Sequence, residues 1–254
     1  MIRKAIINTF LSILLVLTSI TSFAAPISNF IGTYASADTY GDGVINFNSA
    51  LSSEAFFSDA DGVANAFADF GVLKAFSSDP LGSDIGGRAT AAWGDSFTFT
   101  GGSGIGSTTF VFSLDGNITG QGFVRYSLFS DFDLTNGTSA SSVPLRTLID
   151  YQTFGGGTAS LPLTLFSYTT DFTYDEAFTI QAVLEAYVHE NGESDFFNTG
   201  RLNTVIIPTG ATLVTGSGTV YGITPVPEPE TYAMLLAGLG LVGWAARRRK
   251  QAEA

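Results

Sequence analysis

Few residues of this 254-residue chain could do catalytic chemistry, because it has one histidine and no cysteine. His189 is the one imidazole available as a general base, and no G-x-S-x-G sequence supplies a serine nucleophile to work with it. The same counts exclude a histidine-based or thiolate zinc site. Beside Glu190 and Asn191, His189 is typical of an exposed hairpin end.

Acidic side chains leave one route to catalysis open. The closely spaced pairs are Asp59 and Asp61, Asp131 and Asp133, and Asp175 and Glu176. Two carboxyl groups at the right separation are all that glycoside hydrolysis requires. Neighbouring carboxylates on a loop are far more often solvated charge, so we predict that the chain is not an enzyme. A secreted glycoside hydrolase with a carboxylate pair is the alternative.

Oxygen-rich turns are a second kind of candidate site, and the ion that suits them is calcium. Asp131, Asp133, Thr135 and Asn136 precede Gly137, but this glycine falls one place late for the EF-hand pattern and no glutamate closes the loop. A segment of this composition also forms a turn in which a carboxylate bonds the backbone. We therefore predict no cofactor and no metal site, with calcium as the open alternative.

The segments that would position these groups have the pattern of β-strands, because apolar and polar residues alternate along them. The predicted strands are residues 97–100, 109–114, 123–132, 143–154, 161–168, 178–188 and 202–207. The predicted turns are residues 101–104, 115–117, 155–157 and 191–192, which are rich in glycine and asparagine. Residues 63–77 fit either a helical face or a strand.

Many short strands separated by glycine-rich turns predict an all-β body. We expect a single β-sandwich of jelly-roll type, whose two inner faces take the phenylalanine-rich positions. The chain has 22 phenylalanines and no cysteine, so burial and hydrogen bonding must hold the body together without disulfides.

The N-terminus has the three parts of a secretory signal peptide. Arg3 and Lys4 precede an apolar or small stretch at residues 5–20, and a small residue, Ala24, ends the segment. We therefore assign residues 1–24 to the signal peptide and place cleavage between Ala24 and Ala25. N-terminal sequencing of the exported protein should begin at Ala25, and a sequence that began at Met1 would contradict the assignment.

The C-terminal residues 225–254 have the pattern of a short membrane anchor. The punctuating residues are Val226, Pro227, Glu228, Pro229 and Glu230, and the closing cations are Arg247, Arg248, Arg249 and Lys250. Between them, residues 232–246 are uncharged and would rise about 22 Å as a helix. That falls short of a hydrocarbon core of ~30 Å, a deficit that snorkelling cations can cover. The prolines predict that residues 224–230 are an exposed, extended connector separate from both neighbours.

The order of proline-glutamate segment, glycine-containing apolar span and terminal arginine cluster resembles the PEP-CTERM protein-sorting signal of Gram-negative bacteria. The resemblance implies processing by an exosortase, a membrane-embedded enzyme, in bacteria that make extracellular polysaccharide. It also implies export through the inner membrane and transient anchoring by a transmembrane helix. The final location would then be the cell surface or the extracellular space.

The exported body, residues 25–224, has five basic and twenty acidic side chains. Such a surface repels phosphate backbones, so we expect no nucleic-acid partner. With no catalytic constellation in the sequence, we predict a non-catalytic surface or biofilm-matrix protein associated with extracellular polysaccharide. Its expected partners are an exosortase, the membrane before processing, and the polysaccharide.

Overall fold

The computed structural model describes residues 31–39, 42–48, 52–59, 62–79, 86–139, 144–154, 157–226 and 239. The predicted signal peptide and its cleavage point, Ala24 and Ala25, lie outside these residues. So does the predicted C-terminal transmembrane helix, apart from Leu239. Within the part of the chain that the structure describes, no helix is long and apolar enough to cross a membrane.

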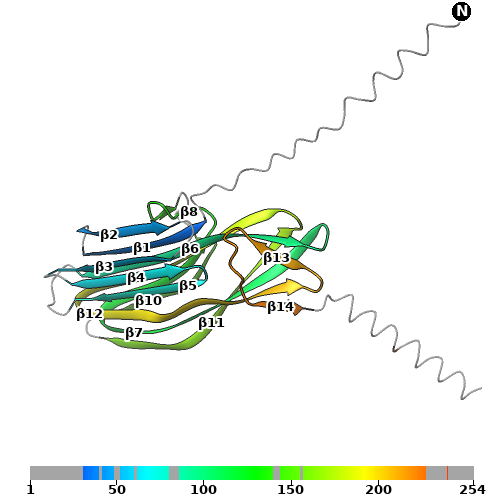
Figure 1. Ribbon diagram of the computed structural model, residues 1–254. Helices are drawn as coiled ribbons and strands as arrows, with labels where there is room; N and C mark the ends of the chain where they lie inside the picture. Colours follow the sequence, from blue (N-terminus) through cyan, green and yellow to red (C-terminus); the bar gives the residue numbers. More distant parts are fainter. Residues whose placement is uncertain are drawn as a thin grey trace, which may run out of the picture.

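Strands make up nearly all of the described residues, which confirms the predicted all-β class. They are β1 (Gly32–Thr39), β2 (Asp42–Asn48), β3 (Ser53–Ser58), β4 (Val63–Asp69), β5 (Val72–Ser78), β6 (Gly87–Thr100), β7 (Ile105–Phe129), β8 (Phe132–Asp133), β9 (Thr138–Ser139), β10 (Arg146–Thr153), β11 (Thr158–Thr173), β12 (Ala177–Pro208), β13 (Thr212–Thr215) and β14 (Ile223–Val226). All except the short β8–β9 pair join one sheet (Figure 1).

The sheet is organised around β12, its longest strand. One edge of β12 pairs first with β6, over residues 177–187, and then with β5, over residues 193–201. The other edge pairs with β7 along almost its whole length, from residue 181 to residue 206. Strand β7 in turn pairs with β10 through its second half and with β11 through its first half. Strands β7 and β12 therefore run through both halves of the sheet. One half contains β6 and β10, and the other contains β5 and β11.

The two halves face each other. Phe112 and Tyr126 lie on the same strand, β7, yet their ring centroids are 5.9 Å apart. Fourteen residues of straight strand would separate them by about 46 Å. Phe97 of β6 likewise reaches Phe110 of β7, with centroids 4.9 Å apart. The sheet thus folds over on itself, and the phenylalanines pack between its halves.

Two predicted turns are wrong, because β7 and β12 continue through them. Gly116 and Asn117 stay in the ladder, opposite Leu161 and Asp195. In β12, Glu190 and Asn191 take positive φ angles of 42° and 59°, and the register with β7 shifts between residues 189 and 193. Glycine and asparagine allow an irregularity inside a strand as readily as a turn between strands. His189 consequently lies at a bend within β12, rather than at a hairpin end.

Residues 63–77, which fit two patterns, form the hairpin of β4 and β5. Ala64, Ala66 and Ala68 alternate along β4 and are completely buried. Gly71 has φ 79° in the turn between the two strands, a conformation that glycine adopts without a steric penalty. The two-residue period of these small buried side chains explains why the segment forms strands and not a helix.

Candidate functional site

A buried carboxylate fastens the last loop of the body to the sheet. Asp95 of β6 is completely buried and accepts hydrogen bonds from the backbone N–H of Ser96 and of Ser217, both at 2.8 Å. It also accepts from the Ser217 hydroxyl at 2.5 Å and from the Tyr221 hydroxyl at 2.9 Å. We call this set of contacts the Asp95 clamp. A buried carboxylate with four donors is well compensated for its loss of water.

Tyr221 links the Asp95 clamp to the hydrophobic core. Its ring packs against Trp93 and Phe97, with centroid distances of 6.0 Å and 5.6 Å. Burial, then the charge of Asp95 and the hydrogen bond to it, raise the pKa of the Tyr221 hydroxyl well above its usual range. The hydroxyl therefore keeps its proton and remains a donor to the carboxylate.

Strand β14 follows the Asp95 clamp directly and carries the chain into the predicted sorting signal. It runs parallel to β12, with Val205 opposite Ile223 and Pro208 opposite Val226. The Val205 N–H donates to Gly222 O at 2.8 Å, and the hydroxyl oxygens of Thr204 and Thr224 are 3.1 Å apart. The predicted independent connector is therefore wrong for residues 224–226, because they pair with the body.

Of the residues that punctuate the predicted sorting signal, the structure describes Val226, and it also describes Pro225 and Leu239 of the same C-terminal segment. The other predicted signal residues, outside the described part of the chain, are Pro227, Glu228, Pro229, Glu230, Arg247, Arg248 and Arg249.

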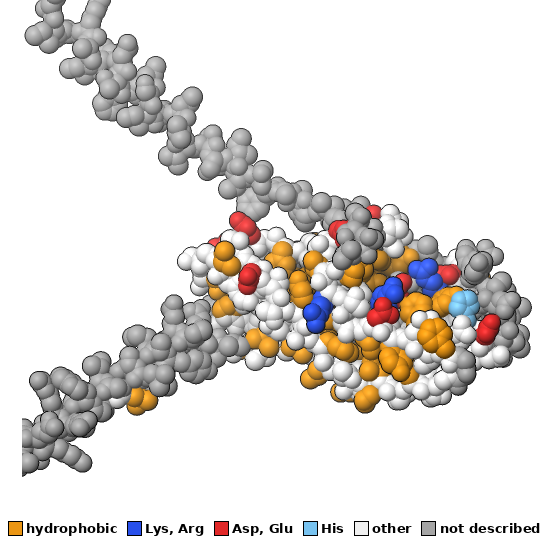
Figure 2. Space-filling view, turned by 180° about the vertical axis from the view of Figure 1, so that it is seen from behind, with side chains coloured by type: hydrophobic (Ala, Val, Ile, Leu, Met, Phe, Trp, Pro, Cys, Tyr) orange, Lys and Arg blue, Asp and Glu red, His pale blue; other side chains and the backbone are white. Residues whose placement is uncertain are grey.

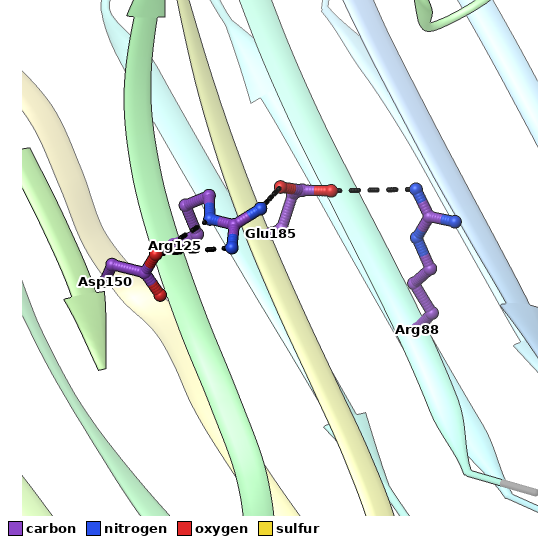
Figure 3. A network of polar contacts seen from close by, with 4 residues as sticks. All are labelled: Arg88, Arg125, Asp150 and Glu185. Carbon is purple, nitrogen blue, oxygen red and sulfur yellow. Dashed lines mark hydrogen bonds and ion pairs between the residues drawn. The ribbon is translucent and has the colours of Figure 1, made fainter. Parts of the chain in front are cut away.

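A row of charged side chains crosses four strands on the outer face of the sheet half that contains β6 (Figure 3). Asp150 of β10, Arg125 of β7 and Glu185 of β12 lie directly opposite one another in the ladder. Arg125 contacts Asp150 at 3.2 Å and Glu185 at 3.9 Å, and Glu185 contacts Arg88 of β6 at 3.6 Å. Exposed pairs of this kind contribute only ~0.2–1 kcal/mol each. We call these four residues the charged row.

Three ring side chains adjoin the charged row, and we call them the aromatic row. Phe123 and Tyr187 are cross-strand neighbours with centroids 5.3 Å apart. The Tyr187 ring meets His189 edge-on at 4.6 Å, and its hydroxyl hydrogen-bonds His189 Nε2. The Arg125 guanidinium lies 5.7 Å from the Phe123 centroid. All three rings are half-buried, so part of each one faces solvent.

The surface view makes the composition of this face visible. Figure 2 shows charged side chains of both signs beside the single histidine, with hydrophobic side chains between them. Farther along the same face, Phe132 and Leu134 from the β8–β9 segment cover Val183. The covering segment leaves the charged row and the aromatic row uncovered.

In the predicted carboxylate turns, Asp133 and Asp59 accept hydrogen bonds from neighbouring backbone and side-chain groups. Asp133 Oδ1 accepts from the Thr135 N–H at 2.9 Å and from its hydroxyl at 2.6 Å, and Oδ2 accepts from the Asn136 amide at 3.1 Å. Asp59 Oδ1 accepts from the Gly62 N–H at 3.0 Å. Within the described ranges, no group of three or more His, Asp or Glu side chains is placed to hold a metal ion.

The comparisons with known proteins concern mainly the C-terminus. Residues 225–250 match the family model of the PEP-CTERM protein-sorting motif, which confirms the resemblance noted on these residues. The motif supports an exported chain that is anchored transiently through its C-terminal region until an exosortase processes it. A comparison with curated proteins found no match.

Among solved structures, the enzymatically active domain of tailspike protein 4 from bacteriophage CBA120 is similar at 12% identity. The similarity covers 66% of this chain and 19% of that one, with a TM-score of 0.23. This chain thus spans about a fifth of the length of that structure, and so weak a likeness says nothing about its activity.

Proposed function

We propose that this exported chain with a PEP-CTERM sorting motif is a non-catalytic surface or matrix protein that binds extracellular polysaccharide. The match at residues 225–250 carries the sorting part of the proposal. The final location that we propose is the cell surface or the extracellular matrix of a biofilm in a Gram-negative bacterium. The proposed body is a single β-sandwich, because Phe97 and Phe110 pack between two facing halves of the sheet.

The charged row and the aromatic row together form the proposed polysaccharide-binding face. Aromatic rings present flat apolar surfaces that suit the C–H faces of sugar rings, and they lose little conformational entropy on binding. Carboxylates accept hydrogen bonds from sugar hydroxyls, while arginine donates to sugar oxygens. The pair Arg125 and Glu185 lies two positions along the ladder from the pair Phe123 and Tyr187, which places both pairs on the same face. One sugar chain would therefore meet both rows.

The face also differs from the rest of the body in charge. Its two arginines balance its two acids, whereas the whole chain has a net charge of −12. A local balance of charge removes the repulsion that an acidic protein would otherwise exert on an acidic polysaccharide. A neutral polysaccharide would meet no repulsion from either surface.

Shortening both rings should weaken polysaccharide binding. We expect the double variant Phe123→Ala/Tyr187→Ala to bind polysaccharide of the source bacterium about tenfold more weakly, which corresponds to about 1.4 kcal/mol. The matched control is Phe56→Ala, since Phe56 is 58% exposed on β3, in the other half of the sheet. Calorimetric titration of the purified body measures the affinities. Equal losses in the two variants would contradict the proposed face.

The alternative function is that of a glycoside hydrolase, and one observation favours testing it. Asp150 and Glu185 flank Arg125 on the same face, so two carboxylates would both lie near a bound sugar chain. Incubation of the body with the polysaccharide, followed by a reducing-end assay, separates the two functions. New reducing ends that disappear in the variants Asp150→Asn and Glu185→Gln would favour the hydrolase over simple binding.

A further inference from the structure

The start of the sorting signal is part of the folded sheet. The motif match begins at Pro225, and Pro225 and Val226 are also the last two residues of β14. In the parallel ladder they lie opposite Ile207 and Pro208 of β12. Figure 1 shows β14 at one end of the body, where it pairs with β12. An enzyme that binds the signal therefore meets its first two residues as part of a folded domain.

Strand β14 is held much less firmly than the loop that precedes it. Two of its four register pairs contain a proline, which has no backbone N–H to donate. The side chains of Ile223, Thr224 and Pro225 are exposed, so little apolar surface is lost when the strand separates from β12. The preceding Ser217 and Tyr221 are fixed by the buried Asp95. The chain is therefore held firmly to the body up to Tyr221 and only weakly from Gly222 onward.

We propose that β14 detaches from β12 and that the processing enzyme binds β14 as an extended strand. The enzyme thereby takes the place of β12 as the pairing partner of β14. This inference rests on the proposed sorting by an exosortase. Extended peptides are commonly bound through their main chain, with pockets for alternate side chains. Detachment back to Gly222 frees four residues, which extends the reach of the signal by about 13 Å. The Asp95 clamp keeps the remainder of the body folded during this step.

A disulfide between β12 and β14 tests whether the strand must detach. The natural chain has no cysteine, so Thr204→Cys/Thr224→Cys can form only one disulfide, where the two hydroxyl oxygens are now 3.1 Å apart. The full chain is expressed in the source bacterium, and conversion to the processed form is followed on gels. We expect the oxidised double variant to stay unprocessed in isolated membranes and to be processed after dithiothreitol is added.

The single variants Thr204→Cys and Thr224→Cys are the matched controls, because neither can form the bridge. Processing of the oxidised double variant at the parent rate would overturn the proposal, since β14 would then remain on β12. If the parent and the single variants also stay unprocessed, sorting by exosortase itself is wrong, and the two failures are thus distinguishable.

A second variant, which weakens the attachment of β14 to β12, should speed processing instead of blocking it. Its test does not depend on disulfide formation. The Thr204 hydroxyl contacts Gly222 O at 3.2 Å and the Thr224 hydroxyl at 3.1 Å. Thr204→Ala removes both contacts, which are exposed to solvent and therefore weak, so we expect processing about two- to tenfold faster. Processing of Thr204→Ala at or below the parent rate would contradict the proposed detachment of β14 from β12.

Discussion

Replacement of Asp95 by alanine should lower the free energy of unfolding of the body by about 3–5 kcal/mol. The change leaves four donors without their acceptor: two backbone N–H groups and the hydroxyls of Ser217 and Tyr221. The Tyr221 hydroxyl and the Ser96 N–H bond to Asp95 in buried surroundings, where a missing acceptor is not readily replaced by water. Denaturant unfolding of residues 25–226 measures the loss.

Two further variants separate the clamp from a general effect of removing charge. Asp171→Ala removes an exposed carboxylate from β11 and should change stability by no more than about 0.5 kcal/mol. Asp95→Asn should fall between alanine and the parent, because its amide oxygen still accepts and the two hydroxyls can turn to accept from its NH2. An Asp95→Ala body as stable as the Asp171→Ala body would show that the clamp contributes little.

Deletion of residues 227–230 should abolish release of the protein from the inner membrane while the body stays folded. These residues are Pro227, Glu228, Pro229 and Glu230, which lie within the motif match but beyond β14. No described core residue is lost, so the free energy of unfolding of the body should not change. The deletion removes the proline-glutamate part of the motif match, which the exosortase is expected to bind. Membrane fractionation and thermal melting measure the two effects.

The chain offers a matched deletion of equal length as the control. Residues 251–254 follow the basic cluster and lie beyond the motif match, so their removal should leave release unchanged. Glu228→Ala should impair release more mildly than the deletion, since only one charged group is lost. Normal release of the 227–230 deletion would refute the sorting role, and a collapsed melt would show that the deleted residues belong to the fold.

The sequence by itself determined the class of the fold and the presence of the sorting motif. Alternation of apolar and polar residues is a property of a single strand, so it can be recognised without knowing the partner strands. The motif match at residues 225–250 is equally local, because its parts follow one another in the chain. The cleavage between Ala24 and Ala25 has the same local character and stays a prediction.

The limits of the strands were decided by pairing. The glycine and asparagine positions at residues 115–117 and 191–192 suggested turns, yet β7 and β12 continue through both. A residue tolerant of positive φ permits a turn or a bulge, and the neighbouring strand selects between them. The strands at Gly32–Thr39 and Ser53–Ser58 were not predicted at all, although their pairing with β6 and β4 makes them part of the sheet.

Only the tertiary structure decided which polar residues act together. Asp95 is one of twenty acids in the body, and three of its four donors, which belong to Ser217 and Tyr221, lie 122 and 126 residues later in the chain. Arg125 and Glu185 contact each other because β7 and β12 are adjacent strands. Strand β14 joins the body because it pairs with an edge of β12. A carboxylate can be buried or solvated, and a strand paired or exposed, according to partners that local sequence does not encode.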